Sequence, residues 1–193
     1  MTSPVVDRAA RSDAWYHDYH SRTGGPQRND PLTDAGVIFQ VAATDIAMLR
    51  AFAALEISEI ARERTRILDV GCAGGRSLAP LIRCGFHPRH LHGVDILADR
   101  VALGTRNYPA FRFLVGDGTN LPYRTGAFDV VMESAMFVQV PDEEIAKQIA
   151  SEMRRVTRSG GAILLGARSG VRSGIAEQCV VVAGHGIRDA VAP

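Results

Sequence analysis

Residues 67–75 read ILDVGCAGG, and this stretch decides the fold. The residues with strand character, 67–70, run directly into a glycine-rich turn, after which residues 76–83 can continue as a helix. A strand, turn and helix in this order aim unpaired backbone N–H groups and the positive end of a helix dipole at the space above the sheet edge. Glycines in the turn let a ligand approach the backbone closely. The stretch therefore predicts a nucleotide-type binding site.

Asp69 lies inside the predicted strand, shortly before Gly71. A carboxylate at this place repels a pyrophosphate, but it can hold a cationic amine of a ligand through ordered water or backbone groups. The sequence therefore indicates that the ligand is a positively charged nucleoside.

The same stretch resembles the first motif of the class I S-adenosylmethionine-dependent methyltransferases, which reads (V/I)LD(V/I)GCGxG. Ala73 stands where the family most often has its second glycine, and a small residue there still permits a close approach to the backbone. The resemblance implies S-adenosyl-L-methionine as the cofactor, held around the following positions: Asp69, Gly71, Cys72, Ala73 and Gly75. Dinucleotide-binding folds also place a G-x-G-x-x-G turn after a strand, so an NAD-dependent oxidoreductase is an alternative.

The composition is that of a single domain with a sizeable core: 193 residues, a net charge of +1 and 46% apolar residues. We expect one methyltransferase-like domain over residues 33–193, which begins with a long amphipathic helix over residues 34–61. No apolar run approaches the roughly 20 residues of a membrane helix, and the N-terminus lacks the pattern of a signal peptide. These features predict a cytoplasmic protein without membrane contact.

The three cysteines, Cys72, Cys84 and Cys179, have the spacing of neither a metal pair nor a disulfide framework. We expect reduced thiols, with Cys72 as a small turn residue, and we find no constellation of metal ligands. The near-zero net charge and the scattered Lys and Arg residues lack the footprint of a nucleic-acid-binding protein. No nucleic-acid partner is therefore predicted.

A second predicted strand, residues 91–95, ends in Asp95. In a doubly wound sheet this residue lies at the carboxyl edge of the strand next to the first one. Its two acceptor oxygens match the two adjacent hydroxyls of a ribose, so Asp95, with Ile96 beside it, is a candidate for cofactor binding. The alternative is that Asp95 caps the helix predicted over residues 98–106.

The third predicted strand, residues 111–115, is followed by Asp117 and Gly118. In the family that this sequence resembles, an acidic residue at the end of this strand commonly reaches the exocyclic amine of adenine. The resemblance therefore implies that Asp117, with Gly118 beside it, binds the adenine end of the cofactor.

The fourth predicted strand ends at Glu133. The residues before it, LPY at 121–123 and GAFDVV at 126–131, resemble the LPF…FDVV pattern of the same family. Glu133 is a candidate general base, or an electrostatic partner of the positive sulfur of the cofactor. The alternative is that it caps residues 134–140.

Residues 1–32 are polar and contain prolines, which predicts a flexible segment with a short amphipathic turn at WYHDYH, residues 15–20. Family members often carry a Tyr-containing segment that folds over the bound cofactor, and this segment is similar in kind. Its candidate residues are Tyr16 and Tyr19 for the lid, and His17 or His20 for a proton acceptor near the substrate. The alternative is that Trp15 and Tyr19 only pin the segment to the domain.

Strand and helix signals alternate along the chain at the spacing of βαβ units. A helix that opens at Asp142 and ends at Gly160 leads to a fifth strand at residues 162–165, and one further strand-like run follows at residues 179–183. We predict an α/β fold: a Rossmann-like, doubly wound, mostly parallel sheet with helices on both faces and reduced C-terminal strands. Such a sheet has an exposed edge, through which a homodimer can form.

The predicted function is methyl transfer from S-adenosylmethionine to a small-molecule or saccharide acceptor, as an O-methylation. The residues ESAM, 133–136, stand where a nucleic-acid N-methyltransferase has an NPPY-like tetrapeptide. Two alternatives stay open. One is a non-catalytic cofactor-binding or scaffold protein with a truncated acceptor site, and the other is the NAD-dependent oxidoreductase, against which Asp69 and the FDVV run argue.

Overall fold

The computed structural model describes residues 4–22, 35–169 and 176–183. Its centre is a six-stranded sheet in the order β3-β2-β1-β4-β5-β6. The strands are β1 (Ile67–Val70), β2 (Leu91–Asp95), β3 (Arg112–Val115), β4 (Phe128–Ser134), β5 (Thr157–Ser169) and β6 (Ala176–Ala183). The first five run parallel, and β6 pairs with β5 antiparallel. The predicted doubly wound, mostly parallel sheet is confirmed, with the strand-like run near the C-terminus as its edge.

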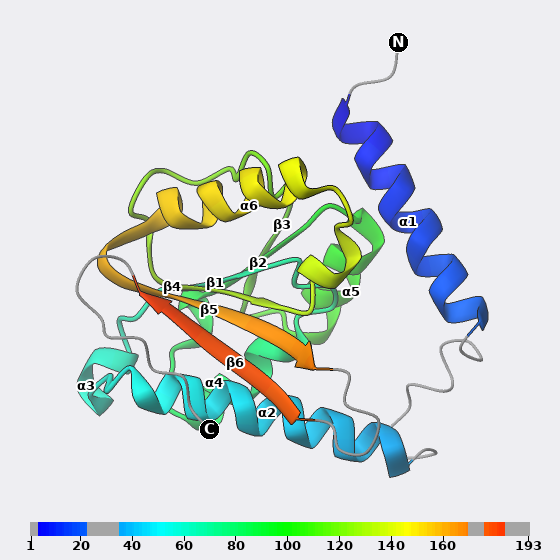
Figure 1. The fold of residues 1–193 in the computed structure, drawn as a ribbon. Helices are drawn as coiled ribbons and strands as arrows, with labels where there is room; N and C mark the ends of the chain where they lie inside the picture. Colours follow the sequence, from blue (N-terminus) through cyan, green and yellow to red (C-terminus); the bar gives the residue numbers. More distant parts are fainter. Residues whose placement is uncertain (1–3, 23–34, 170–175, 184–193) are drawn as a thin grey trace.

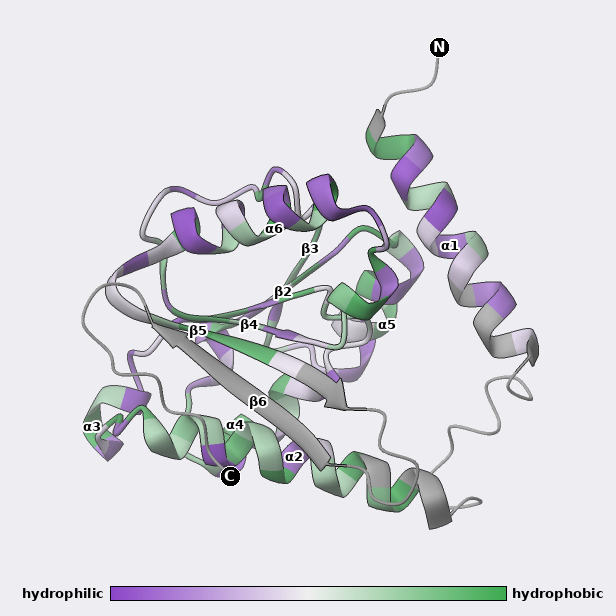
Figure 2. Cartoon of the chain, in the orientation of Figure 1, coloured by the Kyte–Doolittle hydropathy of each residue, from purple (hydrophilic) through white to green (hydrophobic). Residues whose placement is uncertain are grey.

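Helices cover both faces of this sheet (Figure 1). They are α2 (Ala35–Ala54), α3 (Glu59–Arg62), α4 (Ala79–Arg83), α5 (Ala98–Asn107) and α6 (Glu143–Val156). On one face, Met48 and Phe52 of α2 join Ile67 of β1 and Leu81 of α4 in one buried cluster. On the other face, Ile149 and Met153 of α6 join Leu68 and Val131 in a second cluster. Figure 2 shows the outer surface of α6 as hydrophilic and most of α2 as hydrophobic.

The register of the strands aligns their carboxyl ends at one edge of the sheet. Asp69 of β1 lies opposite both Gly93 of β2 and Met132 of β4, and Asp95 lies opposite Val115. Parallel strands that are linked by right-handed crossovers place the segments after their carboxyl ends on this common edge. The glycine-rich turn, Asp95, Asp117 and Glu133 are therefore brought to one place by the topology.

The N-terminal segment folds differently from the prediction. A helix, α1 (Pro4–Arg22), forms where we expected a flexible segment with one short turn. Figure 1 shows α1 standing apart from the helices that cover the sheet. Its sequence is polar on average and has no long apolar stripe from which a helix could be recognised. Ion pairs between neighbouring turns, such as Arg11–Asp7 at 3.5 Å, support the helix instead.

Two predicted helix boundaries are also wrong. The helix expected over residues 34–61 ends at Ala54, because Glu56 adopts a left-handed conformation with φ of 52°, and Ser58 starts α3 as its N-cap. The helix expected to end at Gly160 ends at Val156 instead. Gly160, with φ of 70°, belongs to β5, which is longer than the predicted strand, and the pairing of β5 with β4 shifts register beside it.

The edge strand β3 exposes apolar side chains. Leu114 is 44% exposed and Val115 is 55% exposed. A homodimer through a sheet edge remains a prediction, for which β3 offers an accessible strand. Among the described residues, no helix is both long and apolar enough to cross a membrane.

Candidate functional site

Two neighbouring cavities open at the carboxyl edge of the sheet. The larger has a volume of about 570 Å³ and the smaller a volume of about 220 Å³. Gly71 and Ala73 of the glycine-rich turn line both of them. The larger cavity extends over the ends of β2 and β3, and the smaller one lies between α2, the turn and the end of β4.

The turn itself is held by the neighbouring strand. The backbone N–H groups of Gly71 and Cys72 both donate to the carbonyl oxygen of Val94, at 2.8 and 3.1 Å. Gly71, Ala73 and Gly75 have φ values of 72°, 45° and 76°, so an L-residue sits in a left-handed conformation between two glycines. This conformation costs a non-glycine residue about 1 kcal/mol or more, and such strain is often found at binding sites.

The helix dipole that we expected behind the turn is small. A single 3-10 turn, Arg76–Leu78, precedes α4, which is itself very short. The dipole of an α-helix comes from the aligned peptide groups of several turns. The side chains and N–H groups of the turn, rather than a helix N-terminus, therefore determine the electrostatics of this part of the site.

Asp69 is fully buried at the end of β1. The hydroxyl of Ser77 donates to its Oδ2, whereas its Oδ1 has no hydrogen-bond partner among the described residues. Burial raises the pKa of Asp69 to about 7; the bond from Ser77 opposes this rise, and the charges of Glu133 and Asp95 add to it. A buried oxygen without a partner and a second and third carboxylate nearby make this place receptive to a cation.

Asp95 joins the turn to the segment that leads into α5. Its Oδ2 accepts from the backbone N–H of Ala73 at 2.8 Å, and its Oδ1 accepts from that of Leu97 at 2.9 Å. Burial raises the pKa of Asp95, although these two bonds lower it in part. Leu97, not Asp95, is the N-cap residue of α5. Asp95 and Ile96 both line the larger cavity, and each oxygen of the carboxylate keeps acceptor capacity for a ligand.

Asp117 and Gly118 line the far end of the larger cavity. Burial raises the pKa of Asp117, but hydrogen bonds from Thr119 and Arg8 outweigh it, and the pKa lies below its usual value. Arg8 comes from α1 and also lines this cavity, together with Arg11, Ser12 and Trp15 of the same helix. Of these residues, the sequence had singled out only Trp15, as one that pins the segment to the domain; no local pattern had pointed to the others.

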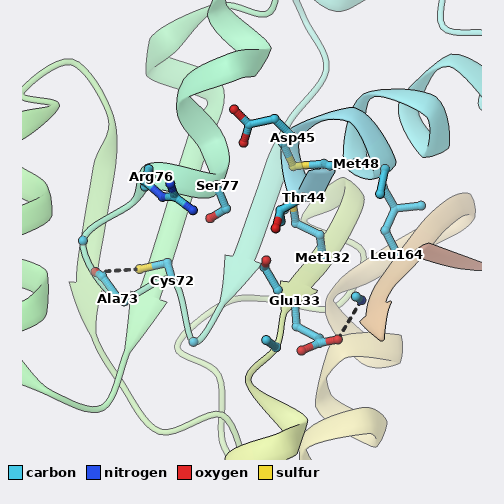
Figure 3. A pocket seen from close by; sticks show the side chains of 16 residues that line it. Thr44, Asp45, Met48, Cys72, Ala73, Arg76, Ser77, Met132, Glu133 and Leu164 are labelled. Carbon is cyan, nitrogen blue, oxygen red and sulfur yellow. Dashed lines mark hydrogen bonds between the residues drawn. The ribbon is translucent and has the colours of Figure 1, made fainter. Parts of the chain in front are cut away.

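Glu133 lines the smaller cavity and binds backbone groups with both of its oxygens. Oε2 accepts from Met136 at 2.8 Å and Phe137 at 3.4 Å, and Oε1 accepts from Gly166 at 2.8 Å, the bond drawn in Figure 3. Burial raises the pKa of Glu133, and the three backbone bonds oppose that rise. The carboxylate thus ties the segment after β4 to β5, and it also contributes negative charge to the cavity wall.

The smaller cavity receives side chains from α2 that we had read only as part of a packing helix. Figure 3 shows Thr44, Asp45 and Met48 on one side of it and Arg76 and Ser77 on another. Burial raises the pKa of Asp45, and the charges of Arg76 and Arg83 lower it in part. The adjacent polar residues Thr44 and Asp45 in a mostly apolar helix were the signal that could have identified this wall.

The remaining candidates differ in how they relate to the cavities. Cys72 is 4% exposed, and burial raises the pKa of its thiol far above the usual range, so the thiol is not a nucleophile. Gly75 packs against Phe113, where an added Cβ would lie 2.4 Å from the ring, and it lines neither cavity. Tyr19 and His20 are part of α1, but their side chains lie outside the described residues.

Comparison with known proteins gives one family match: residues 67–161 match the model of the methyltransferase domain family. The chain is 36% identical over 105 residues to demethylmenaquinone methyltransferase of Beutenbergia cavernae, a match that covers 54% of this chain and 41% of that protein. It is 33% identical over 101 residues to phthiotriol/phenolphthiotriol dimycocerosates methyltransferase 1 of Mycobacterium ulcerans, covering 51% of this chain and 36% of that protein. The chain thus spans about two-fifths of the length of these curated relatives.

Solved structures share the fold. A SAM-dependent methyltransferase from Methanosarcina mazei has a TM-score of 0.50 at 23% identity, and the match covers 54% of this chain and 53% of that one. A putative sarcosine dimethylglycine methyltransferase from Galdieria sulphuraria has a TM-score of 0.54 at 16% identity, covering 64% of this chain and 46% of that one. At this level of identity the likeness concerns the fold alone.

Proposed function

The chain belongs to the class I S-adenosylmethionine-dependent methyltransferases, and on that premise we propose that it transfers a methyl group from S-adenosyl-L-methionine to a small-molecule acceptor. The observation that carries the proposal is the hydrogen bond from Ala73 to Asp95 at the junction of the two cavities, with Asp69 buried behind Ser77, which lines the smaller one. An NAD-dependent oxidoreductase has no support in the family match.

The residues at this junction fit the proposed cofactor. The buried, unpartnered Oδ1 of Asp69 suits a ligand that brings positive charge, and a pyrophosphate would meet repulsion there. Asp95 keeps acceptor capacity for ribose hydroxyls in the larger cavity, and Asp117 with Gly118 lies at the end that suits adenine. When bound, the cofactor supplies an electrophilic methyl group on a positively charged sulfur.

The smaller cavity is the proposed place for the acceptor. Met48, Met132 and Leu164 give it apolar walls that exclude water, and Thr44 and Ser134 add hydroxyl groups that can orient a polar acceptor. Fixing an acceptor atom at near-attack distance is the main way in which a protein accelerates such a transfer. The first task of this chain is then to hold and orient the cofactor and the acceptor.

The site offers few groups that could remove a proton from the acceptor. Both carboxylate oxygens of Glu133 accept hydrogen bonds from backbone N–H groups. We therefore assign Glu133 a positioning role beside the cavity instead of the role of general base. Asp45 lines the same cavity and has a raised pKa, which makes it the better candidate to accept a proton. His20 remains a proposal of the same kind.

The acceptor is proposed to be a small molecule with an acidic hydroxyl or an activated ring carbon. A volume of about 220 Å³ admits one end of such a molecule. The printed names of two relatives, which refer to demethylmenaquinone and to phthiotriol dimycocerosates, agree with small-molecule acceptors. A saccharide hydroxyl, our expectation from the sequence, needs a stronger base and is the second choice.

The test is incubation of the purified chain with S-adenosylmethionine that carries a labelled methyl group. The acceptor panel contains a naphthohydroquinone, a long-chain phenol and a saccharide, with RNA and an unrelated protein as controls. The proposal expects label in the small-molecule fraction, reduced at least tenfold by Asp45→Asn and far less by Asp99→Asn, which removes an exposed carboxylate. Label in RNA or protein would contradict the proposed acceptor class.

A second candidate function is cofactor binding without methyl transfer. It is favoured by the three backbone bonds that occupy Glu133, which leave the site without its expected base. This candidate predicts tight binding of S-adenosylmethionine and no transfer to any member of the panel.

A further inference from the structure

The helix α1 is joined to the end of the larger cavity through one arginine. The Nε of Arg8 donates to Oδ2 of Asp117 at 2.9 Å, across 109 residues of sequence. A terminal nitrogen of the same guanidinium donates to this oxygen as well, and to the hydroxyl of Thr119 at 3.2 Å. With α1 in this position, the side chain of Asp117 is only 8% exposed.

The oxygens of Asp117 already accept most of the hydrogen bonds that a carboxylate can accept. Oδ2 receives two donors from Arg8, and Oδ1 receives the backbone N–H of Thr119 at 2.9 Å. A carboxylate has about four lone-pair sites. A charged guanidinium also makes a stronger hydrogen bond to a carboxylate than a neutral amine does. An exocyclic amine of a ligand therefore meets a carboxylate that is already satisfied.

The guanidinium of Arg8 stands where a ligand amine would have to bind, and the rest of the helix wall lies over the same space. Arg11, Ser12 and Trp15 line the larger cavity from α1, opposite Asp95 and Ile96 of the sheet edge. A nucleoside base whose amine binds Asp117 at this end of the cavity therefore competes with Arg8, and through Arg8 with the present position of α1.

We propose that α1 is an intramolecular competitor for the adenosine end of the larger cavity, and that the bond between Arg8 and Asp117 is the latch that holds it there. This inference rests on the proposed function, because it takes the larger cavity as the site of an adenosine. The cofactor binds when the latch opens, so its apparent affinity is the intrinsic affinity reduced by the fraction of molecules with α1 displaced.

The expected change in ligand affinity depends on the strength of the bond between Arg8 and Asp117. The side chain of Arg8 is 21% exposed, so its ion pair with Asp117 is weaker than a fully buried one. Removal of the latch is expected to raise the apparent affinity for an adenosine ligand about threefold to tenfold. The association rate is expected to rise by a similar factor, since less opening is needed.

The first arm of the test needs no ligand. Trp15 is the only tryptophan of the chain and lines the larger cavity from α1, so its fluorescence reports the position of this helix. We expect Arg8→Ala to increase quenching of Trp15 by acrylamide about twofold. Arg22→Ala is the matched control, because it removes the same charge from the last residue of the same helix. Equal quenching in wild type and Arg8→Ala would overturn the latch.

The second arm titrates the same proteins with S-adenosylhomocysteine. The proposal expects tighter binding by Arg8→Ala, a smaller gain in Arg8→Lys, and increased quenching of Trp15 when the wild type binds. Weaker binding by Arg8→Ala, or a ligand that protects Trp15, would overturn the competition and make α1 a part of the ligand site. If no variant binds, the proposed function fails, while the first arm still decides whether Arg8 holds α1.

Discussion

Replacement of Asp69 by asparagine should stabilise the protein in a pH-dependent way. Asp69 is fully buried, and burial raises its pKa from 3.8 to about 7. A raised pKa means that the folded protein holds this proton more tightly than the unfolded chain does. Stability is therefore lost as the pH rises from the unfolded pKa to the folded one, and the loss is complete above about pH 7.

The magnitude follows from the shift. A rise from 3.8 to about 7 corresponds to about 4 kcal/mol at about 1.36 kcal/mol per pKa unit. An asparagine avoids this cost, since it carries no charge at any pH. The full value is an upper limit, because the amide NH₂ takes the place of an oxygen that has no partner among the described residues, and it then lacks an acceptor itself.

Urea unfolding of wild type and Asp69→Asn between pH 5 and pH 8 measures the effect. The stability difference in favour of Asp69→Asn should grow by about 3 kcal/mol over this range. Asp99→Asn, at an exposed carboxylate of α5, controls for the loss of one negative charge. A difference for Asp69→Asn that stays constant with pH, or one that shrinks as the pH rises, would refute the reasoning.

Two further variants test packing around the site, both by urea unfolding. Gly75→Ala should lower the free energy of unfolding by about 2–4 kcal/mol, because its Cβ would lie 2.4 Å from Phe113 at a φ of +76°. The control is Gly85→Ala, whose Cβ would lie 3.9 Å from its nearest neighbour at a φ of +86°, and it should lose only about 1 kcal/mol. Equal losses in the two variants would count against the clash with Phe113. Arg155→Ala should lower the free energy of unfolding by about 1–2 kcal/mol, because the guanidinium of Arg155 donates to two carbonyl groups of the segment after β3 at 2.8 and 3.0 Å. A similar loss in Arg154→Ala, at an exposed arginine, would disprove a role for these two bonds.

The parallel sheet could be predicted because its signals are local. Each of the strands β1 to β4 is a short apolar run, and Asp69, Asp95 and Glu133 stand at or near the ends of such runs. Once the strands are parallel, their carboxyl ends share one edge. The placement of these carboxylates around a common site therefore needed no knowledge of side-chain packing.

What the sequence could not predict depends on contacts between distant residues. The bond from Arg8 to Asp117 spans 109 residues, and no periodicity in α1 encodes it. The engagement of Glu133 with Gly166 is of the same kind, and it changes the chemistry that this carboxylate can perform. Gly160 was read as the end of a helix, but its left-handed backbone is used within β5.

Calorimetric titration with S-adenosylmethionine and its demethylated product tests the central claim most directly. The proteins to compare are wild type, Asp95→Ala and, as a control at an exposed carboxylate, Asp99→Ala. We predict micromolar binding by wild type and by Asp99→Ala, and a loss of at least about tenfold in Asp95→Ala, because its carboxylate holds both the turn and the proposed ribose site. No binding by well-folded wild type, or equal binding by Asp95→Ala, would contradict the claim that the larger cavity, beside Ala73 and Asp95, holds this cofactor.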